Sequence, residues 1–569
     1  MLDGDSDAAV EVVQSLGRAG AMIDLCAPDD CIAFRSKYVA ARHRQVDATQ
    51  TEAFGAWLRA LDCNAHYDLA IAATERTLRA LRRLRPNDPI RVKAVLPADE
   101  SLDIALDKQR TWKLATDLGI PVPECDLIES LDRLPPVVRY PIVLKTISSL
   151  LLAGDRTILG EVALIEHPEG RLDFLRTYLP YGPVQQQAYV PGHGFGIEFL
   201  YDRGKVAWYF AHERIHEGPR RGGASSYRRS IAPPANLYEA ARRLMDALDW
   251  HGIAMVEFRA QDDGRFHLME INPRLWGSLA LAIDAGVDFP LGLLRIARGE
   301  PLPPQPPYRT NYYARNILED VPWQLANLKA DHSDPTLLTR SRLSSLLEHV
   351  RPLLGQESWD HFDWCDLPVT QAILRKAVMN IGATVQQRWE RRRLARRIIR
   401  HHYSRFGRQC ASDNRIENIL ILCYGNICRS PFAAELSRQK LSGYHIESAG
   451  FAETLGRRTP DDILELARSK GIDLSLHASA RVTDEQVQQA DLILVMDVQN
   501  YQLLAHEWPA ALRRTTMLGL FASPPMLSIS DPYGVPVVEA ARIFDAVLAA
   551  VEGLSIWLET AERAGTRLT

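Results

Sequence analysis

The stretch from Cys423 to Pro431, CYGNICRSP, places a short loop between an apolar run and a helix-like run. The apolar residues 419–422 are typical of a buried strand, and Pro431 suits the first turn of a helix. A strand, a loop and a helix in this order form one unit of a parallel α/β sheet. The βα alternation then continues to the end, which predicts a doubly wound parallel-sheet domain over residues 416–569.

The same loop has the composition of an anion site. Backbone amides of the loop and of the following helix N-terminus would converge on one point, with the thiol of Cys423 at its floor. We expect that field to lower the pKa of the thiol below the ~8.5 of free cysteine, which makes it a nucleophile. Arg429 would grip phosphate oxygens with its planar fork. Gly425 permits close backbone approach, and Asn426 can hold a left-handed turn.

Phosphate-ester chemistry also needs a proton donor for the leaving group. The run SISDPYGVP, residues 528–536, has the composition of a loop. Asp531 in this run can protonate the leaving oxygen and later deprotonate the water that cleaves a phosphocysteine. The ring of Tyr533 can line the pocket and favour an aryl phosphate.

These residues resemble the low-molecular-weight protein tyrosine phosphatase family over about residues 416–569. Five motifs stand in family order: Cys423-x5-Arg429-Ser-Pro, Glu447-Ser-Ala-Gly450, His477-x3-Arg481, Asp491 to Asp497 with Asn500, and Asp531-Pro-Tyr533. The resemblance implies a phosphatase of phosphotyrosine proteins or aryl phosphates that needs no cofactor.

The family pattern also implies a role for each matching residue. Cys423 would be the nucleophile, Arg429 the phosphate clamp, Ser430 a hydroxyl that assists the thiolate, and Asp531 the acid and base. The phosphate-binding loop would comprise Gly425, Asn426, Ile427 and Cys428, with Tyr533 beside it. Two interpretations of Cys428 stay open, plain packing and a reversible redox partner of Cys423.

A second constellation lies in the segment HGIAMVEFRAQDDGRFHLMEINPRLWG, residues 251–277. If Asp263-Gly264 forms a two-residue hairpin loop, residues whose numbers sum to 527 face each other, so Glu257 lies opposite Glu270. Val256, Phe258, Met269 and Ile271 would then form an apolar face, and Glu257, Glu270 and Asn272 a polar one. Two facing carboxylates repel unless a cation lies between them, and these oxygen ligands suit Mg²⁺.

This hairpin and the lysines before it resemble the ATP-grasp superfamily over about residues 1–305, closest to its carbamoyl-phosphate-synthase-like ligases. The matching text is DKQRTWKLATDLGIPVP, YPIVLK, VQQQAYVPGHGFGIEFL and MEINPRLWGSL. The resemblance implies that Lys108 and Lys145 contact ATP phosphates and that Gln187, Tyr189 and Val190 lie near adenine. Glu257, Glu270 and Asn272 would hold Mg²⁺, and Arg274 would steady phosphate or substrate. The implied activity joins an unidentified carboxylate to an unidentified amine.

At 569 residues the chain is too long for one core. We predict an α/β multidomain protein with a pre-ATP-grasp domain over 1–110, an ATP-grasp domain over 111–305, a helical extension and basic linker over 306–415, and the phosphatase domain over 416–569. The start lacks a clear first strand, which leaves open whether the N-terminus of the sequence is complete.

Charge and cysteine spacing limit the partners and the compartment. A net charge of −4 argues against a nucleic-acid-binding surface, and thinly spread cysteines without an apolar leader favour the cytoplasm. Nine arginines lie between 388 and 408. This segment is either a solvated linker helix or a docking site for a peripheral membrane surface or an acidic partner.

Two functional hypotheses follow for the whole chain. The first is a bifunctional enzyme, an ATP- and Mg²⁺-dependent carboxylate–amine ligase fused to a tyrosine-type phosphatase. The second is a phosphatase regulated or scaffolded by a degenerate ATP-binding module, because Ala188 replaces a glutamate common in ATP-grasp relatives. A phosphatase for a small phosphorylated metabolite of a biosynthetic pathway is a third reading.

Overall fold

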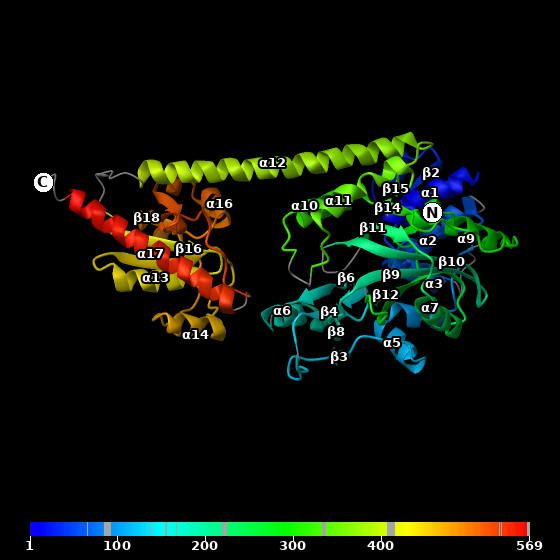
Figure 1. Ribbon diagram of the computed structural model, residues 1–569, viewed down its shortest axis with the longest axis horizontal. Helices are drawn as coiled ribbons and strands as arrows, with labels where there is room; N and C mark the ends of the chain where they lie inside the picture. Colours follow the sequence, from blue (N-terminus) through cyan, green and yellow to red (C-terminus); the bar gives the residue numbers. More distant parts are fainter. Residues whose placement is uncertain are drawn as a thin grey trace. The chain divides into compact units, whose positions relative to one another are not determined.

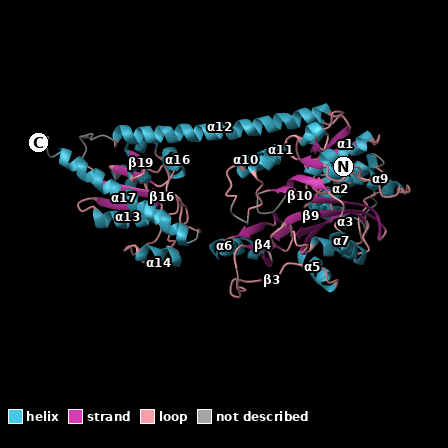
Figure 2. Ribbon diagram, in the orientation of Figure 1, coloured by secondary structure: helices cyan, strands magenta, loops and turns pink. Residues whose placement is uncertain are grey.

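The computed structural model describes residues 1–64, 67–84, 93–137, 139–148, 150–153, 156–166, 168–218, 225–332, 337–406, 416–533, 535 and 537–565. The chain divides into two compact units (Figure 1). Residues 1–166 and 170–381 belong to the first unit, and residues 382–569 belong to the second. Helices and strands occur in both, which confirms the predicted α/β multidomain class (Figure 2).

The first unit opens with alternating helices and strands, as predicted. α1 (Asp7–Arg18) has an acidic residue in its first turn and a basic one in its last, which suits the helix dipole. β1 (Ile23–Ala27) follows and pairs in parallel with β2 (Val39–Arg44). Three helices complete this part: α2 (Thr51–Asn64), α3 (Glu75–Leu84) and α4 (Asp99–Leu106).

A four-stranded antiparallel sheet forms the middle of the first unit. Its spatial order is β3 (Cys125–Ile128), β8 (Val184–Ala188), β4 (Ile142–Thr146) and β7 (Val162–Ile165). Other elements around it are α5 (Lys108–Asp117), β5 (Leu150–Ala153), β6 (Arg156–Leu159) and α6 (Pro168–Tyr178). The carboxylate of Asp107 caps α5 by accepting hydrogen bonds from the amides of Gln109 and Arg110.

A seven-stranded sheet carries the polar face on which one candidate site is built. Its spatial order is β13 (Phe266–Asn272), β12 (Gly252–Ala260), β9 (His193–Asp202), β10 (Lys205–Glu217), β11 (Ser225–Ser230), β14 (Tyr313–Arg315) and β15 (Glu357–Trp359). Neighbouring strands are antiparallel except β14 and β15.

Successive side chains of each strand alternate between the two faces of this sheet, so the two faces pack against different elements. On one face Ile197, Phe199 and Val256 are buried beside α7 (Ala235–Ala247). On the other, Leu200 and Met255 join the core beneath α1, α8 (Leu279–Ala285) and α9 (Phe289–Arg298). Farther along β9 and β12 this second face becomes polar and lines a cavity.

The hairpin of β12 and β13 confirms one register prediction and corrects two details. Glu257 pairs with Glu270, as predicted. The loop is not two residues long, however, because the amide of Gln261 donates to the carbonyl of Arg265, which leaves residues 262–264 in the loop. The register near the loop is therefore displaced by one residue, and an irregularity between Glu257 and Phe258 restores it. Leu268 consequently replaces Met269 on the apolar face, and Met269 lines the cavity.

The prediction of a helical extension over 306–415 needs a correction. β14 and β15 lie in this range and extend the seven-stranded sheet, with α10 (Ile317–Asn327) and α11 (Arg342–Glu348) between them. The guanidinium of Arg315 pairs with Glu357 at 2.8 Å and also with Asp320, which fastens the segment to the sheet. The remainder forms the single long helix α12 (Leu367–Arg405).

The second unit contains a four-stranded parallel sheet, which confirms the predicted doubly wound domain. Its order is β17 (His445–Gly450), β16 (Asn418–Cys423), β18 (Leu492–Val495) and β19 (Thr515–Met517). Its helices are α13 (Arg429–Lys440), α14 (Asp461–Ser469), α15 (Asp484–Gln489), α16 (Val498–Glu507) and α17 (Val537–Gly565). The strand order reverses at β16, and ligands bind beyond the carboxyl end of such a strand.

Both faces of this parallel sheet are covered. Ile419 and Ile421 point into a core with Phe432 of α13 and Phe544 of α17, whose rings stack at 4.2 Å. Leu420 and Leu422 point to the opposite core, which includes Ile398 of α12. This two-sided burial explains why the strand reads as a continuous apolar run.

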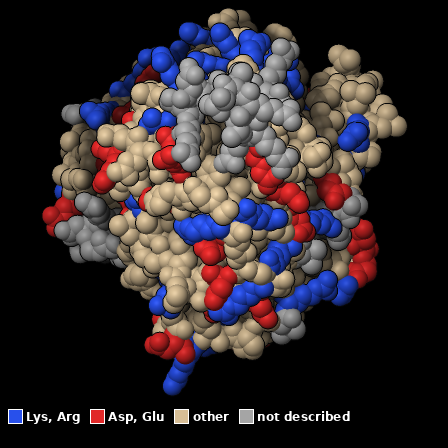
Figure 3. All heavy atoms as spheres, turned by 90° about the vertical axis from the view of Figure 1, so that its left-hand side faces the viewer, with Lys and Arg blue, Asp and Glu red and all other residues tan. Residues whose placement is uncertain are grey.

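The basic end of α12 has a buried side and a charged side. Ile398 and His402 are buried, and the His402 ring lies 2.9 Å from the Thr516 hydroxyl. The exposed arginines are Arg391, Arg392, Arg393, Arg396, Arg397, Arg400 and Arg405. Figure 3 shows Lys and Arg side chains gathered at the top of the view. The Arg388 side chain and Arg408 lie outside the described residues.

No described helix has the length and apolar character that a membrane span requires.

The stacked pair in the second core gives a stability prediction. Phe544→Ala removes a fully buried ring and its contact with Phe432. We expect a loss of about 3–5 kcal/mol in the free energy of unfolding of the second unit. Urea titration followed by phosphatase activity measures it, and Phe544→Leu should lose much less. A denaturation midpoint unchanged by Phe544→Ala would contradict this packing.

Candidate active sites

The loop after β16 brings together most of the residues predicted for phosphate chemistry. β16 ends at Cys423 and α13 begins at Arg429, so the loop lies at the switch point of the sheet. The Cys423 sulfur is 3.0 Å from the Ser430 hydroxyl and accepts a hydrogen bond from the Asn426 amide at 3.2 Å. Asn426 has a φ of 50°, which confirms the predicted left-handed turn.

Asn426 also ties the loop to its neighbours. Its side-chain amide donates to the hydroxyls of Ser430 at 3.0 Å and Ser448 at 3.1 Å. Its side-chain oxygen accepts from the Ala480 amide at 2.9 Å. Because Asn426 donates to the Ser430 oxygen, the proton of that hydroxyl has two acceptors in reach, the Cys423 sulfur at 3.0 Å and the Ala449 carbonyl at 3.3 Å. The loop is therefore held in shape by a fully buried side chain.

Arg429 lies in the loop with two carboxylates around it. Its guanidinium donates to Asp497 at 2.7 Å and to Asp531 at 2.5 Å. Although burial opposes its charge, Asp531 and Cys423 raise the pKa of Arg429 above its ordinary value. Its Nε is buried and has no hydrogen-bond partner among the described residues. An anion bound at the loop would satisfy this donor.

The other motifs of the second unit support the loop from outside. Gly450 pairs with Cys423, and a Cβ at Gly450 would lie 2.7 Å from the Tyr424 carbonyl oxygen, so the loop needs glycine here. The His477 ring lies 2.7 Å from the Asn426 carbonyl. The Asp491 carboxylate accepts from the Asn418 amide, and Asp497 caps α16 by accepting from the Asn500 amide. Gly450, His477 and Asp497 thus meet around the loop, whereas Asp491 holds the opposite end of β16.

The remaining predicted residues surround the loop. Ile427 and Cys428 are buried, and burial raises the pKa of the Cys428 thiol well above its ordinary value. Tyr533 is half-buried and accepts a hydrogen bond from the Arg457 guanidinium at 3.1 Å. The Asp531 carboxylate is about half exposed, at 48%, so solvent reaches it.

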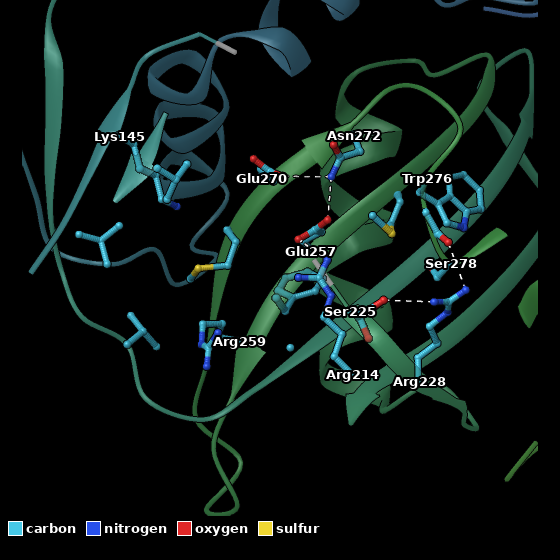
Figure 4. A pocket seen from close by; sticks show the side chains of 18 of the residues that line it. Lys145, Arg214, Ser225, Arg228, Glu257, Arg259, Glu270, Asn272, Trp276 and Ser278 are labelled. Atoms are coloured by element: carbon cyan, nitrogen blue, oxygen red, sulfur yellow. Dashed lines mark hydrogen bonds and ion pairs between the residues drawn. The ribbon is translucent and has the colours of Figure 1, made fainter. Parts of the chain in front are cut away.

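A second site is a cavity of about 760 Å³ in the first unit (Figure 4). It is lined from the four-stranded sheet by Lys145, Gln187, Tyr189 and Val190, and from the seven-stranded sheet by Glu257, Glu270 and Asn272. Arg274 also lines it, and the Arg274 guanidinium donates to the Leu275 carbonyl. Most residues predicted for ATP and metal binding therefore share one cavity.

The polar face of the seven-stranded sheet is organised in rows of paired residues. Glu270 pairs with Glu257, Glu257 with Gly196, and Gly196 with His212. Directly paired residues project from the same face of a sheet. The two predicted carboxylates and the histidine therefore share one row.

Asn272 and two lysines neutralise the carboxylate pair in part. The Asn272 amide nitrogen donates to Glu257 at 2.9 Å and to Glu270 at 3.2 Å. Lys108, which is not among the residues that line the cavity, lies 3.8 Å from the Glu270 carboxylate. Burial alone would raise the pKa of Glu270, but Lys108 and Lys145 hold it below its ordinary value. Burial also lowers the pKa of Lys145, against the opposing effect of Glu270.

Three arginines form the next row of the sheet. Arg259 pairs with Gly194, and Arg214 pairs with Arg228. Each guanidinium has a carboxylate partner: Arg214 with Glu257 at 2.6 Å, Arg259 with Glu217 at 3.1 Å, and Arg228 with Asp360. Figure 4 shows Arg214, Arg228 and Arg259 on the opposite side of the carboxylates from Asn272. In the sequence, the alternation His212, Arg214, His216 was a local indication that Arg214 shares a face with the two histidines.

Comparison with known proteins finds a family match in each unit. Residues 418–564 match the family described as low molecular weight phosphotyrosine protein phosphatase. Residues 187–318 match the family described as ATP-grasp in the biosynthetic pathway with Ter operon.

Individual relatives match the phosphatase part. A probable low molecular weight protein-tyrosine-phosphatase, EpsP, of Ralstonia nicotianae is 39% identical over 118 residues, 21% of this chain and 79% of the relative. The phosphatase Ptp of Acinetobacter johnsonii is 38% identical over 120 residues, 21% of this chain and 82% of the relative. The solved YwlE arginine phosphatase from Geobacillus stearothermophilus is 30% identical, with 25% of this chain and 94% of that chain covered and a TM-score of 0.24.

The second unit is thus a phosphatase with a cysteine at the floor of its anion loop. The chain belongs to the low-molecular-weight phosphotyrosine protein phosphatase family, through residues 418–564. It also carries an ATP-grasp domain, matched over residues 187–318, so it is a fusion of an ATP-grasp domain and a phosphatase domain.

The loop geometry predicts that Asn426 is essential to the shape of the phosphatase site. Asn426→Ala removes three buried side-chain contacts and places a residue with no local hydrogen bond at positive φ. We expect a loss of about 2–3 kcal/mol in stability and at least tenfold in kcat/KM for an aryl phosphate. Asn426→Gly, which tolerates the backbone conformation, separates the two causes. Wild-type kinetics in the alanine variant would refute the role of this residue.

Proposed function

We propose that residues 416–569 hydrolyse aryl phosphates through a covalent phosphocysteine, with phosphotyrosine proteins as the substrate class. The Cys423 thiolate attacks phosphorus, and the bond from phosphorus to the leaving oxygen breaks as Asp531 supplies a proton to that oxygen. Water then attacks the phosphocysteine and gives its proton to Asp531. The sulfur–phosphorus bond breaks, which releases phosphate and restores the thiolate.

One observation carries this proposal more than any other. Arg429 combines a buried Nε that has no partner among the described residues with two carboxylates held at its other nitrogens. Asp531 therefore lies beside the group that would grip the phosphate, where a proton donor for the leaving oxygen must be. Ser430, at 3.0 Å from the sulfur, supports the thiolate that the second step regenerates.

The rings near the loop support an aryl ester as substrate. Tyr424 is about half exposed, and the ring of Tyr533 lies in the loop after Ile529 with the Arg457 guanidinium 5.4 Å from its centre. Aromatic walls stabilise an aryl group through its face and edge. Since one relative is a protein-arginine-phosphatase, rates on phosphotyrosine, phosphoarginine and alkyl phosphate substrates should be compared. Faster alkyl ester hydrolysis would favour a small-metabolite substrate instead.

The proton-donor assignment gives a leaving-group prediction. Asp531→Asn should slow hydrolysis of phenyl phosphate by about 10²-fold or more, but slow p-nitrophenyl phosphate much less, because a good leaving group needs little protonation. Steady-state kcat across substituted phenyl phosphates measures this as a steeper dependence on leaving-group pKa. Cys423→Ser is the matched control and should abolish turnover of every ester. Equal slowing across the series would contradict Asp531 as the acid.

We further propose that the cavity of the first unit activates a carboxylate with ATP and joins it to an amine. Lys108 and Lys145 would contact phosphates, and Gln187, Tyr189 and Val190 would lie beside adenine. A substrate carboxylate attacks the γ-phosphorus, ADP leaves, and the resulting acyl phosphate is open to the amine. The retained lysines and carboxylates support catalysis over a degenerate nucleotide-binding module.

The residues around the carboxylate pair fit a divalent cation. Glu257 and Glu270 face each other, and the Asn272 amide, which can turn its oxygen toward them, lies at 2.9 and 3.2 Å from their oxygens. Oxygen donors of this kind suit Mg²⁺. When bound, the ion would neutralise phosphate charge. Glu257, Glu270 and Asn272 would hold it.

The acidic end of the cavity supports an amine as the second substrate. Asp7 and Glu319 both line the cavity. Burial raises the pKa of Glu319, and the nearby Asp7 acts in the same direction. Two carboxylates that destabilise each other favour a cation between them, and an ammonium group meets that need.

The paired carboxylates predict a loss of metal-dependent ATP use. Glu270→Gln removes one oxygen-anion ligand and leaves Lys108 and Lys145 without their shared partner. We expect ADP formation with pooled proteinogenic amino acids to fall by at least about 10²-fold and the Mg²⁺ midpoint to rise. Glu239→Gln, on the exposed side of α7, is the matched control. An unaltered Mg²⁺ titration would count against this site.

Three broader assignments remain part of this proposal. The domain limits near residues 110 and 415 follow the resemblance to the two families. The exposed arginines of α12 support docking on an anionic lipid surface or an acidic protein. The scattered free thiols support the cytoplasm as the compartment.

A further inference from the structure

His212 is a buried histidine whose two ring nitrogens have different surroundings. Its Nδ1 lies 2.5 Å from a carboxylate oxygen of Glu198, and both residues are almost fully buried. Its Nε2 has no hydrogen-bond partner among the described residues and is not sealed from the cavity that the ring lines. One nitrogen is therefore anchored and the other is open.

The sheet register explains how this ring reaches the site. Gly196 lies between His212 and Glu257 in one row of the sheet. A Cβ at Gly196 would lie 2.3 Å from Cε1 and 2.7 Å from Nδ1 of His212, so the ring occupies the space that a side chain would need. The imidazole thus leans over the glycine toward the carboxylate pair.

His216, two pairs farther along β10, shows the contrast with a structural histidine. Its Nδ1 lies 2.7 Å from Asp320 and its Nε2 lies 3.1 Å from Glu348. Its ring stacks on Trp323 at 3.6 Å. Both nitrogens of His216 lie near carboxylates within the core, although its Nε2 makes no hydrogen bond to Glu348, whereas the ring of His212 lines the cavity.

We propose that His212, oriented by Glu198, is the general base of the ligase reaction, and this rests on the proposed carboxylate–amine ligase. As the neutral amine attacks the acyl carbon, a carbon–nitrogen bond forms and the carbon–oxygen bond to phosphate breaks. Phosphate leaves with that electron pair, and Nε2 of His212 takes one proton from the nitrogen. The Glu198 carboxylate stabilises the imidazolium and fixes Nδ1 as the protonated nitrogen.

The position of His212 suits this role better than the neighbouring groups do. Arg214 cannot accept a proton, and Glu257 and Glu270 belong to the set that would hold the metal ion. Lys145 lies among the groups proposed to contact phosphate. His212 is thus the side chain of the carboxylate row that can accept a proton and has no other assignment.

Hydroxylamine provides a test that separates the base from acyl-phosphate formation. It is mostly unprotonated at neutral pH and traps acyl phosphates as hydroxamates without a protein base. For His212→Gln, supplied with ATP, Mg²⁺ and pooled proteinogenic amino acids, we expect amide formation to fall by about 10²-fold or more. Hydroxamate formation should stay within about threefold of the wild-type rate.

Two further variants keep the test independent of folding. Glu198→Gln retains the shape of the pair but not its charge, and should lower amide formation less than His212→Gln while leaving hydroxamate formation intact. His267→Gln, on β13 and outside the lining of the cavity, is the matched control and should behave like the wild type. ATP affinity and thermal midpoints of all variants should match.

The outcomes distinguish the base from the ligase itself. Wild-type amide formation by His212→Gln would overturn the base alone. Parallel loss of amide and hydroxamate in both His212→Gln and Glu198→Gln would also overturn it, because the pair would then serve acyl-phosphate formation or folding. A wild-type enzyme that yields neither ADP nor hydroxamate would remove the proposed ligase and, with it, the base.

Discussion

The opposition of Glu257 and Glu270 on neighbouring strands is the constraint around which the first unit is built. Directly paired like charges destabilise a sheet, yet both carboxylates are held within a cavity. The Asn272 amide approaches both of them, Arg214 approaches Glu257, and Lys108 approaches Glu270. These donors are thus needed before any ligand binds.

The sequence of the hairpin illustrates what a local pattern can predict. The predicted hairpin register, in which the numbers of facing residues sum to 527, placed Glu257 opposite Glu270, and the structure agrees. It does so because two departures cancel, a loop longer by one residue and an irregularity that displaces Met269 from the apolar face. Neither departure can be recognised in the amino-acid sequence, since Asp-Asp-Gly fits both loop lengths. The pair was predictable, but the face of Met269 was not.

The phosphatase loop was predictable almost residue by residue, since its donors lie within one short segment. The polar face of the seven-stranded sheet was not, because it depends on how β9, β10 and β12 pair. His212 and Glu198 become a pair only through the register of β9 with β10. The same strand pairing explains the glycines at positions 194 and 196. A Cβ at Gly194 would meet Arg214, and a Cβ at Gly196 would meet His212. Such a constellation has no fixed spacing along the chain.

Both sites contain charged side chains that need partners of opposite character before a ligand binds. The charge is positive in the phosphatase loop and negative in the cavity of the first unit. The phosphatase loop must hold a cation for a phosphate, and Asp497 and Asp531 accompany Arg429 in the meantime. In the ligase that we propose, Glu257 and Glu270 would hold a metal ion, and in this structure Asn272, Arg214 and Lys108 accompany them. An uncompensated buried charge would cost several kcal/mol, so each site carries internal partners of the opposite character.

The two carboxylates beside Arg429 differ in exposure: Asp531 is about half exposed and Asp497 much less so, at 48% and 22%. In the mechanism that we propose, the more exposed carboxylate, Asp531, releases Arg429 to a phosphate and serves as the proton donor, while Asp497 keeps the guanidinium in place.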